Sequence, residues 1–213
     1  MRRIPAEAKK EINQLIWCIE MLLVRTTGIS TTVVALLDKG NGDDDIPISL
    51  MYVMYRITIR IRGDFIRKWD DTESGDWDYS RAKRVALGAT YTDEVDTEFQ
   101  VESGNEVTGA LLDMAKFYDS VDLIPLMQAA HKMSYPLRLL MLAITSYINP
   151  RCIKKHGMLH SGKLVYNSII AGCGQAVSLA RALLHRPLQQ LKNFMPNITV
   201  RQYVDDLRIK SSG

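Results

Sequence analysis

Hydrophobic positions along the chain change between a helical and an extended spacing, which predicts a mixed domain of helices and strands. Apolar residues recur at helical spacing over 6–26, whereas Thr31–Leu37 is β-branched and apolar and precedes a turn-like run rich in Gly and Asp. We expect helices over 6–26, 51–61, 81–101, 123–133, 136–150 and 176–194, strands over 31–37, 46–50 and 107–114, a short hairpin around His156 and Leu164, a strand–turn–strand over 198–210, and a loop over 70–80.

Length and composition indicate one domain with a substantial core. The chain has 213 residues, of which 46% are hydrophobic, and this is enough to bury most of the apolar surface of a single domain. The three cysteines lie far apart without zinc-binding spacing, and neither a signal peptide nor an apolar run of membrane-spanning length is found. These features favour an intracellular protein, and they do not distinguish nucleus from cytoplasm.

Charge is distributed unevenly along the chain, although the net charge is only +3. Residues 1–130 hold 15 Lys and Arg against 22 Asp and Glu, whereas residues 131–213 hold 12 Lys and Arg against two Asp. These two, Asp205 and Asp206, are adjacent, and no other acidic residue follows Asp122. A basic segment of this kind suggests an anionic polymer as partner, or simply a solvated surface.

Two acidic motifs carry candidate chemistry. Asp113 ends an apolar strand, and Asp205 and Asp206 lie between two apolar strands. Adjacent carboxylates repel each other unless a cation or a proton offsets their charge. Brought together, the three carboxylates would hold two divalent cations about 4 Å apart, the arrangement used for phosphoryl transfer, and oxygen ligands favour Mg²⁺. Taken singly, each motif also fits a solvated turn or a strand-end cap.

Four segments, in order along the chain, resemble the motifs of one family. Tyr203–Asp206 matches an aromatic-x-Asp-Asp signature, and Asp113 with Phe117–Val121 resembles Asp-x-x-x-Ala-Phe-Asp-Ser-Val. Ile170–Cys173 occupies the place of a Gln-Gly-Cys turn, and Leu37–Lys39 with Ile46–Leu50 resembles Pro-Lys … Arg-Pro-Ile-Ser-Leu. The sequence thus resembles a reverse transcriptase, most closely the non-LTR retrotransposon kind.

The resemblance implies an α+β fold, with a polymerase palm made of an antiparallel sheet backed by helices. We expect an unassigned helical segment over 1–29, fingers over 30–105 and a palm over 106–213 that ends just after the Asp-Asp hairpin, with the thumb missing. A truncated or divergent element fits this organisation, because no endonuclease or RNase H segment is found.

The resemblance also assigns roles to single residues. Asp113, Asp205 and Asp206 would be catalytic ligands of two Mg²⁺ ions, for which Mn²⁺ could substitute. Tyr118 would lie against the sugar of the incoming nucleotide and exclude a 2′-hydroxyl. Gly172 would let the backbone approach the bound nucleic acid or nucleotide closely.

Cationic residues would contact phosphates. The resemblance places Lys39 near the triphosphate, and it gives Arg201 and the basic residues from Lys132 to Lys192 contacts to the primer-template. We further expect Asp119 and Asp122 to cap helix starts.

Some positions depart from the family pattern. Ile46 stands where an Arg is usual, Phe117 where a small Ala is usual, and Ala171 where a Gln is usual. The acidic run 43–45 would also face an anionic nucleotide unfavourably if it lies near the site.

The expected activity is RNA-directed DNA synthesis, with an RNA template, a DNA primer and deoxynucleoside triphosphates as partners and no membrane. The chain would be part of a larger polyprotein, a decayed mobile-element copy or a divergent working enzyme. The alternatives are a non-catalytic nucleic-acid-binding remnant and a globular protein with a chance acidic turn.

Overall fold

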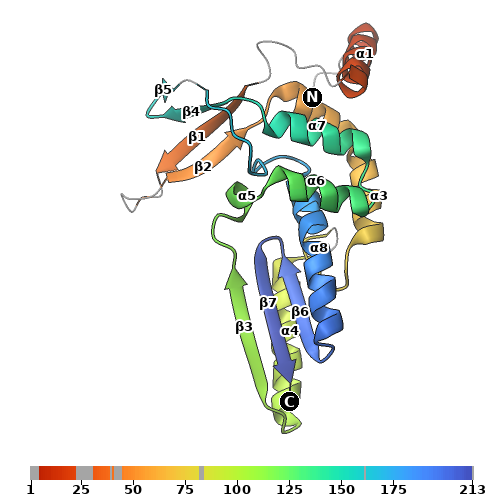
Figure 1. Cartoon of the computed structure of the whole chain (residues 1–213), viewed down its shortest axis with the longest axis vertical. Coiled ribbons are helices and arrows are strands. Elements are labelled where there is room, and N and C mark those ends of the chain that lie inside the picture. The colour runs from red at the N-terminus through yellow and green to blue at the C-terminus, as the bar shows by residue number, and fades with distance from the viewer. Residues whose placement is uncertain are drawn as a thin grey trace.

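The computed structural model describes residues 5–22, 31–38, 40, 45–81, 84–160 and 162–212. Figure 1 shows a four-stranded sheet toward one end of the molecule and a three-stranded sheet toward the other, with helices beside and between them. Within these ranges, no helix combines the length and apolar character needed to cross a bilayer. The helices are α1 (Ala6–Leu22), α2 (Val53–Ile61), α3 (Gly63–Glu73), α4 (Ala86–Glu102), α5 (Phe117–Ser120), α6 (Leu123–Lys132), α7 (Leu137–Tyr147) and α8 (Ala176–Phe194).

The four-stranded sheet joins segments far apart in the sequence. β1 (Thr32–Asp38) pairs antiparallel with β2 (Asp45–Leu50) and parallel with β4 (Arg151–Lys155). β5 (Met158–Leu159) pairs antiparallel with β4 and forms the edge of the sheet. β4 lies in the range expected for the palm, yet it pairs with β1, which lies in the range expected for the fingers.

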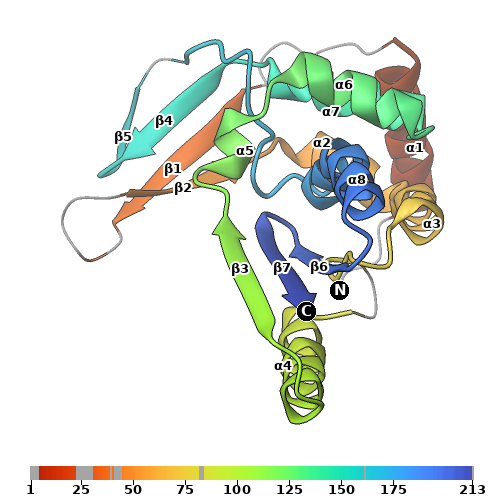
Figure 2. The same cartoon turned by 60° about the horizontal axis from the view of Figure 1, so that its bottom comes forward.

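The three-stranded sheet is antiparallel, in the order β3–β7–β6. It consists of β3 (Val107–Asp113) and the hairpin β6 (Ile198–Tyr203) and β7 (Asp206–Ser212). Figure 2 shows α4 and α8 beside this sheet, and both helices contact it. The expected antiparallel sheet backed by helices is confirmed.

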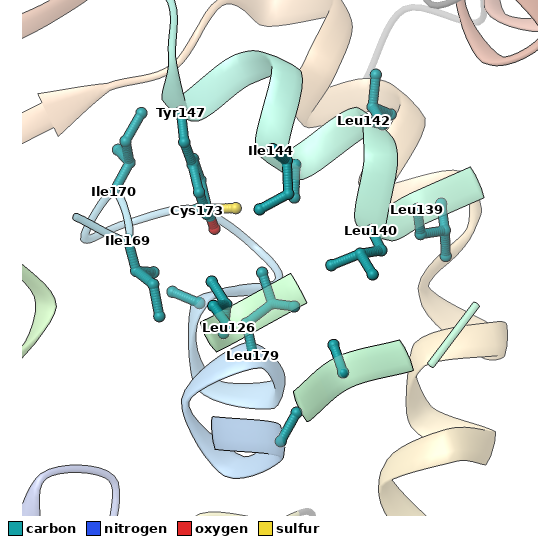
Figure 3. Packing of buried hydrophobic residues seen from close by; sticks show 14 of the residues in the cluster. Leu126, Leu139, Leu140, Leu142, Ile144, Tyr147, Ile169, Ile170, Cys173 and Leu179 are labelled. Atoms are coloured by element: carbon teal, nitrogen blue, oxygen red, sulfur yellow. The ribbon is translucent and has the colours of Figure 1, made fainter. Parts of the chain in front are cut away.

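The main core lies among the helices. Leu126 of α6, Leu140 of α7 and Leu179 of α8 are buried and face one another (Figure 3). Tyr147 and Cys173 belong to the same core, and burial raises the pKa of the Cys173 thiol. Cys173 therefore packs in the interior.

The structure differs from the expected elements mainly at α3. This helix includes residues 70–73, which were expected to belong to a loop. Its Ile66 and Trp69 are buried, and the Trp69 indole Nε1 donates a hydrogen bond to the Met133 carbonyl oxygen at 2.8 Å. Tertiary contacts stabilise the helix in this acidic segment, although its composition alone indicates a loop. The second strand of the expected hairpin is β5, while Lys163, next to Leu164, forms an isolated bridge with Arg151.

Candidate active site

The three-stranded sheet brings the two acidic motifs together. Asp113, the last residue of β3, is the register partner of Asp206, the first residue of β7. Asp205 precedes Asp206 in the turn between β6 and β7. Residues 92 and 93 positions apart in the sequence are thus adjacent in the fold, because the hairpin lies alongside β3.

The hairpin turn has an unusual backbone that is held by a buried amide. Val204 has a φ of 59°, a left-handed conformation that is costly for a β-branched residue. The Gln202 side chain, only 3% exposed, donates from Nε2 to the Val204 carbonyl oxygen at 2.9 Å. The Gln202 backbone also pairs with Trp77 and Tyr79. These bonds fix the turn that carries Asp205.

A cavity of about 260 Å³ lies where the two sheets approach each other. It is lined by Asp113, Asp205 and Tyr118, with Pro47 and Ser49 contributed by β2. Asp206 does not line this cavity and instead lines a second one of about 270 Å³, which it shares with Asp113. The structure therefore brings Asp113 and Asp205 to one cavity, and Asp113 and Asp206 to another.

Tyr118 is held in place by a neighbouring segment. Its carbonyl oxygen accepts a hydrogen bond from the Ile169 amide at 2.8 Å, and the Val121 carbonyl oxygen accepts one from the Ser168 amide at 2.7 Å. Burial, with smaller contributions from Asp205 and Cys173, raises the pKa of Tyr118 to about 12. The phenol is therefore neutral over the physiological range.

Gly172 lies beside the cavity rather than in it. Its φ is +88°, and a Cβ added there would lie 3.4 Å from the Ser49 carbonyl oxygen. It lines a neighbouring groove of about 700 Å³ together with the exposed Arg56 and Arg60 of α2. Lys39 lies outside the described residues. Ile46 pairs in register with Leu37 in the β1–β2 ladder.

The donor set of the site fits a hard divalent cation. Asp113, Asp205 and Asp206 form no ion pair within the described part of the chain, so their carboxylates remain available. Across those same residues, no group of three His, Cys, Asp or Glu side chains is arranged to hold a metal ion. Oxygen atoms from water and a phosphate substrate would have to complete the coordination shell.

The prediction that Arg201 contacts primer-template phosphates is wrong. The Arg201 side chain is 9% exposed, and its guanidinium pairs with Asp93 and Asp96 of α4. Asp93 also pairs with Arg208 at 2.6 Å and with Lys210 at 3.4 Å. These ion pairs hold α4 against the sheet, and carboxylates of the protein itself offset the charge of Arg201.

Two further basic residues of the C-terminal segment are also occupied internally. The buried Arg181 pairs with Asp70 and Asp78, and Lys192 pairs with Asp76 at 2.9 Å. The basic bias of this segment therefore serves partly to neutralise acidic residues of the first half of the chain.

One of the two expected helix caps is confirmed. The Asp122 carboxylate accepts a hydrogen bond from the Ile124 amide at 2.9 Å and caps α6. Asp119 lies inside α5 and caps no helix start.

Sequence reasoning missed Gln202, Arg56 and Arg60, and it included Arg151 only within the basic range from Lys132 to Lys192. Only the four-residue spacing of the two α2 arginines was a visible signal, because the others depend on tertiary contacts.

Comparison with known families identifies the class of protein. Residues 46–213 match the family model described as reverse transcriptase (RNA-dependent DNA polymerase). The chain belongs to the reverse transcriptase family, a family of nucleotidyltransferases that generally use divalent metal ions. No curated protein matches the sequence.

Solved structures show the same fold. The apo telomerase of Candida tropicalis matches with a TM-score of 0.62 and 8% identity, over 98% of this chain and 44% of that one. A form of it truncated from the C-terminal domain matches with a TM-score of 0.60 and 11% identity, over 96% of this chain and 49% of that one. This chain thus spans less than half the length of either structure. At such low identity, the likeness shows the arrangement of fingers and palm alone.

Proposed function

We propose that the chain is the catalytic part of an RNA-directed DNA polymerase, encoded by a retrotransposon-like element of the non-LTR kind. It would extend the 3′ end of a DNA primer along an RNA template, using deoxynucleoside triphosphates. The observation that carries the proposal is the shared cavity of Asp113, Asp205 and Tyr118, with Asp206 in register beside Asp113. The rest of a larger polyprotein would supply the remaining domains.

Asp113, Asp205 and Asp206 would hold two Mg²⁺ ions, and Mn²⁺ could substitute. When bound, such ions make the primer hydroxyl a better nucleophile and stabilise the pyrophosphate leaving group. The residues of the chain itself position the reactants. The bonds from Gln202 fix the turn that presents Asp205, and the bonds from Ser168 and Ile169 fix Tyr118. We also propose that Lys39 lies near the triphosphate.

Tyr118 would form the wall that meets the sugar. Replacing Tyr118 by Ala should raise the incorporation of ribonucleotides relative to deoxynucleotides at least about tenfold, because the ring no longer blocks the 2′-hydroxyl. Single-nucleotide extension with matched dNTP and rNTP substrates measures the ratio. Tyr118→Phe is the control and should keep the wild-type ratio between pH 7 and 9, since the phenol, with a pKa of about 12, does not ionise there. An Ala variant that discriminates as well as the wild type contradicts this role.

The groove beside Gly172 would bind the template strand through its phosphates. Arg56 and Arg60 are exposed and form no ion pair among the residues described, unlike Arg181 and Arg201. Their four-residue spacing on α2 places both on one face of the helix.

Replacing Arg56 and Arg60 together by Gln should weaken RNA binding and reduce its salt dependence. Each lost contact to single-stranded RNA lowers the slope of log K against log salt by about 0.7, so the pair should lower it by about 1.4. Fluorescence anisotropy with a labelled RNA measures the slope. The matched control replaces Lys9 and Lys10 of α1, and an equal change in both double variants would show only a general effect of charge.

A second candidate is a nucleic-acid-binding remnant without turnover. The lack of a ready-made three-ligand cluster among the described residues favours it. Primer extension on RNA and DNA templates of the same sequence decides between the two functions. Extension on RNA supports the polymerase, and RNA binding without any extension in Mg²⁺ or Mn²⁺ supports the remnant.

A further inference from the structure

Arg151 is held from two sides at the junction of the two sheets. As the first residue of β4 it is the register partner of Thr32 in β1. Its backbone also exchanges two hydrogen bonds with Lys163, each 2.9 Å long. The pairing with β1 and the bonds to Lys163 therefore fix the position of the Arg151 backbone.

The Arg151 guanidinium is only partly satisfied by the protein. Nη1 donates to the Ser168 hydroxyl at 3.0 Å, and Nη2 donates to the Tyr147 carbonyl oxygen at 3.1 Å. Nε is buried and has no hydrogen-bond partner. Across the described ranges, Arg151 enters no ion pair, whereas Arg62 at the end of α2 pairs with Glu20 at 2.7 Å.

A half-buried cation without an anion is unfavourable for the protein alone. Burial lowers the pKa of Arg151, and the exposed Asp119 only opposes this shift from a distance. Such a group is stabilised when a bound anion takes the place of lost water. The incomplete pairing of Arg151 thus points to a ligand of negative charge.

Arg151 lines the same 260 Å³ cavity as Asp113, Asp205 and Tyr118. Of the other charged side chains there, Asp119 is acidic, and Lys116 is exposed at the start of α5. Asp113, Asp119 and Asp205 make this cavity acidic, and a preorganised cation in its lining favours the entry of an anionic nucleotide. A planar guanidinium held by Ser168 and Tyr147 suits phosphate oxygens better than a flexible ammonium does.

We propose that Arg151 binds the triphosphate of the incoming nucleotide. This inference rests on the proposed polymerase function and adds to it a phosphate-binding residue from β4, outside the motifs that suggested the family. Arg151 then provides a fixed positive charge facing the acidic ligand set, and it draws the nucleotide toward the wall formed by Tyr118.

The test measures binding of inorganic tripolyphosphate in magnesium buffer by calorimetry. Arg151→Gln should weaken this binding by at least about tenfold, the usual size of a lost charge-assisted hydrogen bond, and Arg151→Lys should retain part of it. Lys68→Gln removes an exposed cation of α3 that lines none of the cavities described above, and it should leave affinity within about twofold. Thermal unfolding of each variant identifies a loss of fold, and if Arg151→Gln does not fold, the Lys variant decides.

Extension kinetics provide the second measurement. Loss of a triphosphate contact should raise the KM for dNTP about tenfold or more while kcat changes little. A residue that only positions Ser168 and Tyr118 would instead change the dNTP-to-rNTP ratio and leave tripolyphosphate binding intact, and this result would overturn the proposal. Tripolyphosphate binding that depends on Arg151 in a protein without extension activity would refute the polymerase function and keep the phosphate site.

Discussion

Replacing Asp205 by Asn should reduce primer extension at least about a thousandfold, the largest effect on activity that the structure predicts. The amide keeps the size of the side chain and removes the charge needed to ligate a divalent cation. Because Asp205 is partly exposed and forms no ion pair within the described ranges, the variant should fold normally and bind RNA as the wild type does. Gel-based extension with dNTPs and magnesium measures the loss.

Asp71→Asn is the matched control, since Asp71 is an exposed residue of α3 and lines none of the cavities described above. It should extend primers at the wild-type rate. Extension that survives in Asp205→Asn would contradict the metal mechanism, because that mechanism needs the charge of Asp205 as well as those of Asp113 and Asp206.

Replacing Asp93 by Asn should cause the largest loss of stability, about 3 kcal/mol in the free energy of unfolding. Asp93 is 1% exposed and pairs with Arg201, Arg208 and Lys210. Without its charge, the buried Arg201 and Lys210 lose their main counter-ion, and α4 is no longer held to β6 and β7. Urea unfolding followed by circular dichroism measures the change.

Asp96→Asn serves as the control because it removes a neighbouring carboxylate that is 47% exposed. An exposed pair contributes little, so the loss should stay below about 1 kcal/mol. Equal losses of unfolding free energy in the two variants would contradict the expected contribution of the burial of Asp93.

Local patterns predicted much of the fold. The strand β3, the β6–β7 hairpin and helices α6 and α8 agree with the expected positions because their apolar spacing is regular. The parallel pairing of β1 with β4 left no sign in the sequence, since a contact across more than a hundred residues depends on the whole chain.

The sequence predicted which residues belong to the candidate site better than it predicted how they are arranged. The antiparallel register places Asp113 beside Asp206, as the three-aspartate hypothesis requires, yet the cavity with Tyr118 is shared by Asp113 and Asp205. Binding of metal by the three carboxylates stays a prediction. Charge counting failed at Arg201, because a sequence does not show which cations face an internal carboxylate.

The parallel pairing of β1 with β4 has a consequence for biosynthesis. During translation, β1 and β2 are synthesised about a hundred residues before β4. The four-stranded sheet can therefore form only after residues 151–155 have left the ribosome. A ribosome-bound chain that stops near residue 105 should therefore be open to protease, and one that extends past residue 194 should resist it once the helical core has closed.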